Sequence, residues 1–327
     1  MNNLMVLGAV AALVMSGCTN EQVVTTSQRQ GIEVGKSYVA NSTRADFTPI
    51  TNDGIREFYL YGGYDTNMTH VFNNVKVSST DGNSWTYAGD VRYWINEKNY
   101  KFAAYAPEAV SSVVTPDFEN GVLKFTNYNS SPEHQNDLIY ATKEYMAKEK
   151  DNSALTLSFK HMLSQVYFTF YNNLAKDVTI KMSNIKLSGV KCQGSHDGQY
   201  MDPSSREMLK DWSLGTETAD YTYGNVEKKS TSSSSQDAVS TQMYVMIPQK
   251  EGSLTFTFTL TLVNELGHEV SSSEKSFTIT PNWEMGKSYQ YIVQVNGKEA
   301  GLEQIMIGDP TVGAWENSGS GTVLTQN

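Results

Sequence analysis

Alternation of apolar and polar residues over ten consecutive positions is the feature of this sequence that most restricts its fold. In residues 254–263 leucine or phenylalanine occupies every second position, and threonine occupies most of the positions between them. A period of two places the apolar side chains on one face of a β-strand and the threonines on the other. A turn at residues 264–267 leads into residues 270–279. We therefore expect a long hairpin whose apolar face, including Phe258, packs in the core of a β-sandwich.

Shorter runs of the same kind recur along the chain. Strand-like runs at residues 56–64, 70–77, 100–105 and 165–171 are bounded by Gly, Asn and Asp, which is typical of turns between antiparallel strands. Aromatic residues make up 11% of the chain, with 19 Tyr and 12 Phe, a composition typical of half-buried pleated strands. We therefore predict an all-β protein with little helix.

The length of the chain favours two domains. Its 327 residues exceed one ordinary sandwich, because domains typically contain about 100 to 200 residues. Residues 143–151 are dense in charge and poor in core residues, so we place the boundary there. This predicts two antiparallel β-sandwiches, residues 45–151 and residues 152–327. Residues 228–240 have no periodicity and no large apolar cluster, so we expect a mobile surface loop in the second domain.

The N-terminus has the features of an export signal. Residues 4–15 are apolar or small, and the run is shorter than the roughly 20 residues that cross a bilayer, so residues 1–17 are predicted to be a signal peptide. A Met-Ser-Gly-Cys sequence ends the run and resembles a bacterial lipobox, in which Cys18 would carry lipid. The alternative is an ordinary signal peptide with an incidental cysteine. Cys192 then lacks a disulfide partner, and we expect it to be a buried thiol.

Residues 18–44 are expected to form a propeptide with a short strand that can be removed. The apolar residues that fall on one face of this strand at period two are Ile32, Val34 and Tyr38. Two of the five arginines of the chain, Arg29 and Arg44, flank the strand in polar surroundings that a trypsin-like protease reaches easily. We predict proteolytic processing at Arg44 or Arg29; the alternative is that both arginines are solvated linker charges.

Residues that could carry chemistry are few and scattered. The five histidines show no paired spacing typical of a metal site, and no phosphate-binding loop or nucleophile elbow is present. The nearest approach to a zinc site in the sequence is the cluster Cys192, His196, Asp197 and Asp202. We do not favour a zinc site in this cluster, and His161 fits a core histidine. We expect that the protein is not an enzyme and that it binds neither a cofactor nor a metal ion.

Charge and aromatic residues bear on the partners. The net charge is −10 and no stripe of Lys or Arg occurs, so a nucleic-acid partner is not expected. Three closely spaced tyrosines, Tyr59, Tyr61 and Tyr64, are open to two interpretations. They could stack on a sugar if exposed, or they could lie in the core and at a sheet edge.

Six short segments occur in a characteristic order. These segments are residues 93–94, 100–107, 137–141, 159–166, 245–249 and 283–291. Together they resemble the fimbrillin family of Bacteroidales type V pili, and the resemblance runs from about the lipobox to the last residue. It implies two transthyretin-like β-sandwich domains and export as a lipoprotein precursor of the outer membrane. It also implies assembly at the cell surface by strand exchange, after an arginine-specific protease removes the N-terminal strand. In the cluster considered as a zinc site, the resemblance implies a turn at residues 198–200.

The resemblance assigns roles to both ends of the mature chain. Arg44 stands where the family often has its arginine, just before the first strand of the mature body. Residues 310–315 are similar to the last core strand, and residues 316–327 to the tail that serves as donor strand for a neighbouring pilin subunit. Val323 and Leu324 are the only large apolar residues of this tail.

Two classes of function therefore compete. The first is a structural subunit of a fimbrium that supports adhesion, with other pilin subunits and a processing protease as partners. The second is an adhesive tip or anchor subunit, or a surface lipoprotein that binds a host protein or glycan without polymerising.

Overall fold

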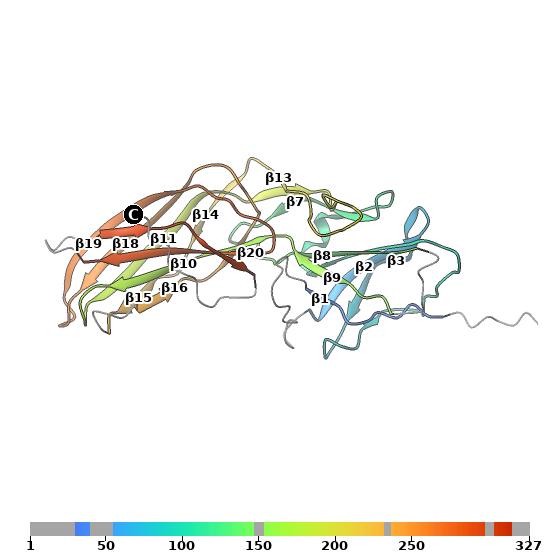
Figure 1. Cartoon of the computed structure of the whole chain (residues 1–327), viewed down its shortest axis with the longest axis horizontal. Helices are drawn as coiled ribbons and strands as arrows, with labels where there is room; N and C mark the ends of the chain where they lie inside the picture. Colours follow the sequence, from blue (N-terminus) through green and yellow to red (C-terminus); the bar gives the residue numbers. More distant parts are fainter. Residues whose placement is uncertain (1–29, 40–54, 147–153, 232–236, 298–303, 316–327) are drawn as a thin grey trace, which may run out of the picture.

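The computed structural model describes residues 30–39, 55–146, 154–231, 237–297 and 304–315. Over these residues the chain is almost entirely β-strand, and the only helix that they contain is the short 3-10 helix η1 (Glu108–Val113). None of the described helical structure is long and apolar enough to cross a bilayer. The prediction of an all-β fold is confirmed. The strands form four sheets in an elongated molecule (Figure 1).

The first and second sheets pack against each other at one end of the molecule; we call this pair the first sandwich. The first sheet contains, in spatial order, β1 (Tyr38–Val39), β9 (Ser158–His161), β8 (Ile139–Tyr145), β5 (Tyr100–Ala106), β2 (Glu57–Tyr64), β3 (Asn67–Ser78) and β4 (Thr86–Tyr87). The second sheet contains β13 (Ser213–Leu214), β12 (Gln193–His196), β7 (Val122–Asn129) and β6 (Val114–Asp117). Tyr105 and Tyr140 of the first sheet are fully buried in one core with Phe125 of the second.

The third and fourth sheets form the second sandwich at the other end (Figure 1). The third sheet contains β16 (Asp237–Ser240), β17 (Tyr244–Met246), β10 (Ser164–Asn173), β20 (Lys287–Asn296), β21 (Gln304–Ile307) and β22 (Thr311–Ala314). The fourth contains β14 (Thr218–Thr222), β15 (Val226–Lys229), β11 (Thr179–Lys191), β18 (Leu254–Val263) and β19 (Glu269–Ile279). The rings of Phe168 in β10 and Phe256 in β18 stack at 3.8 Å between the two sheets.

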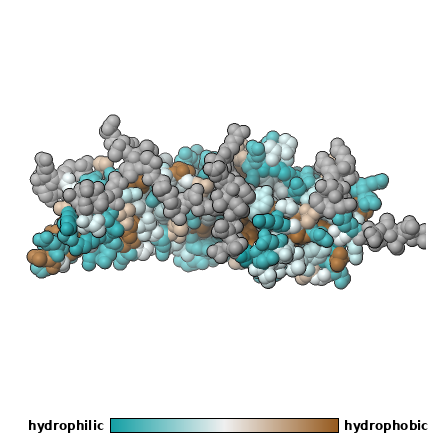
Figure 2. All heavy atoms as spheres, turned by 60° about the horizontal axis from the view of Figure 1, so that its bottom comes forward, coloured by the Kyte–Doolittle hydropathy of each residue, from teal (hydrophilic) through white to brown (hydrophobic). Residues whose placement is uncertain are grey.

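The long hairpin predicted from alternation is present. β18 and β19 pair in antiparallel register from Leu254 opposite Ile279 to Val263 opposite Glu269. Phe258 is 1% exposed, whereas Thr255 on the other face is exposed, so the predicted face is confirmed. The turn lies at the far end of the molecule, where Leu266 and Val270 are exposed. Figure 2 shows a group of hydrophobic residues at that end, on a surface that is otherwise mostly hydrophilic among the described residues.

The expected division between residues 151 and 152 does not follow the sheets. β9 lies beyond this point but pairs with β8 of the first sheet, and β12 pairs with β7 to complete the second. The charges that suggested a boundary begin inside β8, where Lys143 and Glu144 face solvent. The charged residues that were interpreted as a linker between domains therefore begin at the exposed end of a strand.

The predicted mobile loop at residues 228–240 is also corrected where the structure describes it. β15 occupies its beginning and pairs with β11, and β16 occupies its end and pairs with β10. Ser230 is fully buried, and a carboxylate oxygen of Asp237 accepts hydrogen bonds from Thr231 N (2.6 Å) and Oγ1 (2.9 Å). Short polar strands at a sheet edge need no apolar periodicity, so the sequence pattern did not reveal them.

Candidate functional site

The N-terminal segment, residues 30–39, is held on both sides by main-chain hydrogen bonds and ends in β1 (Figure 1). On one side the bonds, donor first, are Ile32 N to Arg92 O (2.7 Å) and Trp94 N to Gln30 O (3.0 Å). On the other side they are Leu155 N to Glu33 O (2.7 Å), Gly35 N to Leu155 O (2.9 Å) and Tyr38 N to Leu157 O (3.2 Å). The segment therefore fills a gap between residues 92–94 and the stretch that leads into β9. We call this gap the slot.

Apolar side chains fasten the segment to the core. Ile32, Val34 and Val39 are 1%, 7% and 5% exposed, and all three belong to the apolar cluster on the face of the first sheet that points away from the second sheet. Phe102 and Phe159 are fully buried in the same cluster. Removal of the segment would expose this cluster and leave main-chain donors and acceptors unpaired along both walls of the slot.

The prediction that Tyr38 shares the face of Ile32 and Val34 is wrong. Val34 is opposite Leu155, but Tyr38 is opposite Ser158, so four steps along the segment match three steps along its neighbour. The extra residue is a β-bulge, which reverses the alternation of the residues after it. Tyr38 is consequently half-buried. Val39, which sequence reasoning missed, is buried in its place; glycine inside a strand pattern, here Gly35, is the signal that could have indicated the bulge.

The residues predicted to be modified or exchanged lie outside the described part of the chain. These residues are Cys18, Arg29, Arg44, Val323 and Leu324. Arg29 directly precedes the described segment, and Arg44 follows its last described residue, Val39, by five positions. The two predicted processing sites therefore bracket the segment that fills the slot.

The sequence matches the model of a known protein family. The model of the family described as fimbrillin-like matches residues 43–315, which is most of the chain. The chain belongs to the fimbrillin-like family. No curated protein matches the sequence. The predicted family is confirmed.

Two solved structures support the same fold at low sequence identity, and a third shows a weaker similarity. A candidate cell adhesion protein of Bacteroides ovatus aligns with a TM-score of 0.50 and 14% identity over 89% of this chain and 99% of its own. A candidate cell adhesion protein of Parabacteroides distasonis aligns with a TM-score of 0.50 and 8% identity over 90% and 98%. A fimbrial assembly protein of the same species is similar at a TM-score of 0.42 and 11% identity over 85% and 96%.

The side chains of two other arginines of this fimbrillin-like chain form hydrogen bonds and other specific contacts. Arg92 donates from Nε to Val71 O (2.8 Å), and its guanidinium lies over the rings of Phe72 and Tyr87. Arg206 forms an ion pair with Glu144 (2.5 Å) and donates to Thr142 Oγ1 (2.5 Å). A protease must pull such a side chain out of its contacts before it can bind the arginine. Cleavage after Arg92 and after Arg206 is therefore expected to be slow.

An arginine-specific protease is expected to cut the fimbrillin-like precursor at Arg29 or Arg44 before it cuts at Arg92 or Arg206. The interactions of Arg92 and Arg206 would have to break first, whereas the sequence around Arg29 and Arg44 is polar and is expected to be accessible to a protease. Mass spectrometry of a digestion time course measures the order of cuts. An early fragment that ends at Arg92 or Arg206 would contradict the expectation.

The cluster considered as a zinc site forms a turn in the fimbrillin-like fold. His196 Nε2 lies 2.6 Å from Lys210 O, and its Nδ1 accepts from Gly198 N (2.8 Å), so both ring nitrogens are occupied. Burial lowers the pKa of His196, in keeping with a neutral ring. Cys192 is a buried free thiol whose pKa is raised by burial. Over the described residues no group of three or more His, Cys, Asp or Glu side chains could hold a metal ion.

The tyrosines considered as a sugar platform do not form one. Tyr59 and Tyr61 are 6% and 7% exposed and belong to the core between the first and second sheets. Tyr64 is half-buried and stacks on His70 (5.3 Å). Of the two interpretations of these residues, the core and edge roles are the ones that the structure supports.

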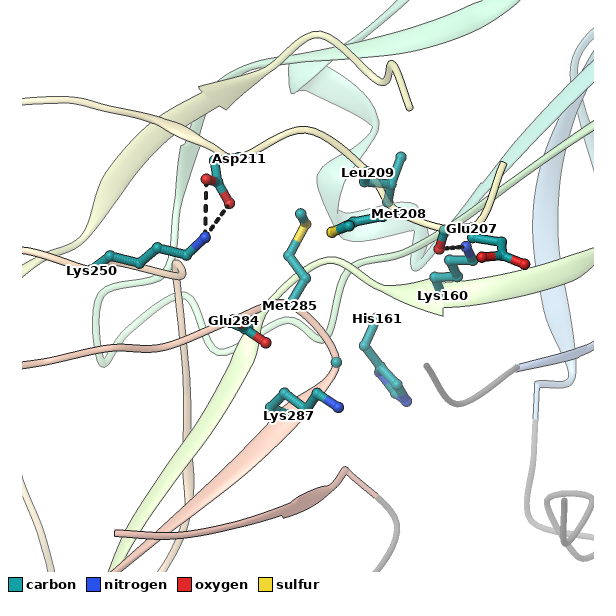
Figure 3. Close-up of a pocket in the computed structure, with 11 residues that line it drawn as sticks. Lys160, His161, Glu207, Met208, Leu209, Asp211, Lys250, Glu284, Met285 and Lys287 are labelled. Carbon is teal, nitrogen blue, oxygen red and sulfur yellow. Dashed lines mark hydrogen bonds and ion pairs between the residues drawn. The ribbon is translucent and has the colours of Figure 1, made fainter. Parts of the chain in front are cut away.

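A cavity of about 320 Å³ lies between the two sandwiches of the fimbrillin-like fold (Figure 3). Met208 and Met285 point into it, between the Asp211–Lys250 ion pair (3.0 Å) and Lys160, whose pKa burial lowers. His161 borders the cavity, but its Nδ1 lies 2.9 Å from Asp137 and its ring stacks on Trp315. The lining residues include no Ser, Thr or Cys that could act as a nucleophile. The slot therefore remains the candidate site.

Proposed function

We propose that this chain is a structural subunit of a surface fimbrium, exported as an outer-membrane lipoprotein and joined to its neighbours by strand exchange at the slot. The observation that carries the proposal is the segment of residues 30–39, which places three apolar side chains in the cluster on the outer face of the first sheet and forms main-chain hydrogen bonds to both walls of the slot. Membership of the fimbrillin-like family supports the fimbrial assignment. The proposed role is structural and adhesive, not catalytic.

The proposed mechanism begins with cleavage after Arg44 by an arginine-specific protease. The cut separates the N-terminal segment from the body, which then holds it by non-covalent contacts alone. A strand from another subunit replaces the segment, restores the main-chain hydrogen bonds and fills the apolar positions, which is β-augmentation repeated along a fibre.

The substitution Arg44→Ala tests the proposal. The variant is expected to reach the cell surface but to be absent from the fibre fraction sheared from the cells, because its segment stays covalently attached in the slot. Arg29→Ala is the matched control, and it should enter the fibre fraction, because a cut at Arg44 still frees the segment. Immunoblots of the sheared and cell-bound fractions measure both. Normal incorporation of Arg44→Ala would favour processing elsewhere, and fibre-free surface protein in the wild type would favour the tip, anchor or receptor role.

Lipidation is expected to depend on Cys18 alone. Cys18→Ser should abolish incorporation of a fatty-acid analogue and reduce delivery to the outer membrane, because the predicted lipobox offers one acyl attachment point. Cys192→Ser should leave the label unchanged, since the Cys192 thiol is buried. Undiminished label in Cys18→Ser would mean that the chain has an ordinary signal peptide.

A further inference from the structure

We infer that the slot is built to receive a strand of a different polypeptide, and that the tail of this chain, residues 316–327, is not its occupant. The inference rests on the proposed function and specifies the partner. The partner strand carries two apolar residues two positions apart, then a small residue followed by a bulge, and a third apolar residue beyond the bulge. In a fibre, the chain would then accept a strand from another kind of subunit.

The segment that fills the slot defines what the slot accepts. Its apolar positions, held by Ile32, Val34 and Val39, are separated by a step of two residues and a step of five. The step of five includes the bulge. A strand without the bulge would place its last apolar side chain on the outer face of the sheet.

Two glycines add a requirement for size. A Cβ at Gly35 would lie 3.1 Å from Ala154 Cβ and 3.2 Å from Thr156 Oγ1. A Cβ at Gly31 would lie 3.1 Å from Val91 Cγ1. All three separations are tighter than ordinary van der Waals contact, so the walls would have to move to accept a larger residue. Val91 is exposed and can move aside, so the slot favours a small residue mainly at the position of Gly35.

The sequence of the tail does not meet these requirements. Its only large apolar residues, Val323 and Leu324, are adjacent, and adjacent residues of a strand face opposite sides. In a regular strand only one of them can enter the slot, whereas the segment inserts three apolar side chains. The loss of two apolar side chains corresponds to at least about 100-fold weaker binding.

Peptide binding to the processed protein tests the inference. The full precursor is cut with an arginine-specific protease, and fluorescence anisotropy measures the uptake of labelled peptides in excess. The peptide of residues 30–39 is expected to bind at least about 100-fold more tightly than the peptide of residues 316–327. Substitution of both Ile32 and Val34 by Ser in the first peptide should lower its affinity to about that of the tail peptide. Gly35→Val should also weaken binding, while Glu33→Gln, at an exposed position, should not.

The outcomes separate the inference from the function on which it rests. Tight binding of peptide 30–39 and weak binding of the tail peptide, with processed protein that stays monomeric on native electrophoresis, would support both. Equal affinity of the two peptides, or polymerisation of the purified chain with itself, would overturn the inference and leave strand exchange standing. Uptake of neither peptide would overturn both, because the slot would then not exchange its strand.

Discussion

Replacement of Ile32 by Asp is expected to open the slot without proteolysis. The Ile32 side chain is 1% exposed and lies in an apolar cluster with Trp94 and Phe102. A carboxylate buried there without a partner costs several kcal/mol, which is comparable with the net contribution of the main-chain hydrogen bonds described above between the segment and the walls of the slot. The uncut variant should therefore take up the labelled peptide of residues 30–39, and uncut wild type should not.

Two matched variants separate this effect from general unfolding. Ile32→Val removes one methylene at about 0.5 to 1.5 kcal/mol and should leave the slot closed. Glu33→Asp changes an exposed neighbour and should have no effect. The second sandwich has a separate core, so the Ile32→Asp protein should retain its cooperative unfolding transition. An Ile32→Asp protein that excludes the peptide would mean that the segment cannot leave the first sandwich.

The substitution Phe258→Ala is expected to lower the free energy of unfolding by about 3 to 5 kcal/mol. The Phe258 ring is fully enclosed between the sheets of the second sandwich, 5.2 Å from the ring of Phe170 and 6.0 Å from that of Phe277. Truncation to alanine removes these contacts and leaves a cavity that the surrounding strands cannot fill completely. Chemical denaturation of the mature body measures the loss.

Thr255→Ala is the control in the same strand. Thr255 faces solvent, so its substitution should change stability by no more than about 0.5 kcal/mol. Cys192 is the only cysteine among the described residues and its thiol is free. No disulfide between described residues therefore compensates for damage to the core. A loss below about 1 kcal/mol for Phe258→Ala would mean that the second sandwich tolerates the cavity by local repacking.

The parts of the fold that the sequence predicted are those set by local periodicity. The β18–β19 hairpin was predicted because only one face of a strand can bury Phe256, Phe258 and Leu260 together. The pairing of β9 with β8 and of β12 with β7 was not predicted. β7 and β12 are far apart in the sequence, so their register depends on the assembled core. β8 and β9 are consecutive strands, but the charged stretch that begins in β8 suggested a domain boundary between them.

The slot was predicted in part for the same reason. Ile32 and Val34 lie before the bulge, where alternation holds, and the structure places both in the core. Tyr38 and Val39 lie after it, where one extra residue reverses the pattern. A bulge depends on the partner strand, and that partner, near Leu155, is more than a hundred residues away. The environment of His196 likewise could not be predicted, because its Nε2 is hydrogen-bonded to the carbonyl oxygen of Lys210, which lies on a different stretch of the chain.

The continuity of β9 with β10 has a mechanical consequence. β9 pairs with the N-terminal segment and ends at His161, and β10 begins at Ser164 and pairs along its length with β20. The two strands follow one another along the long axis of the molecule (Figure 1). Tension applied to a strand in the slot would pass directly into the central strands of the second sandwich. Because that tension acts along the strands, it would load their hydrogen bonds in shear, all together, and not one after another as in unzipping.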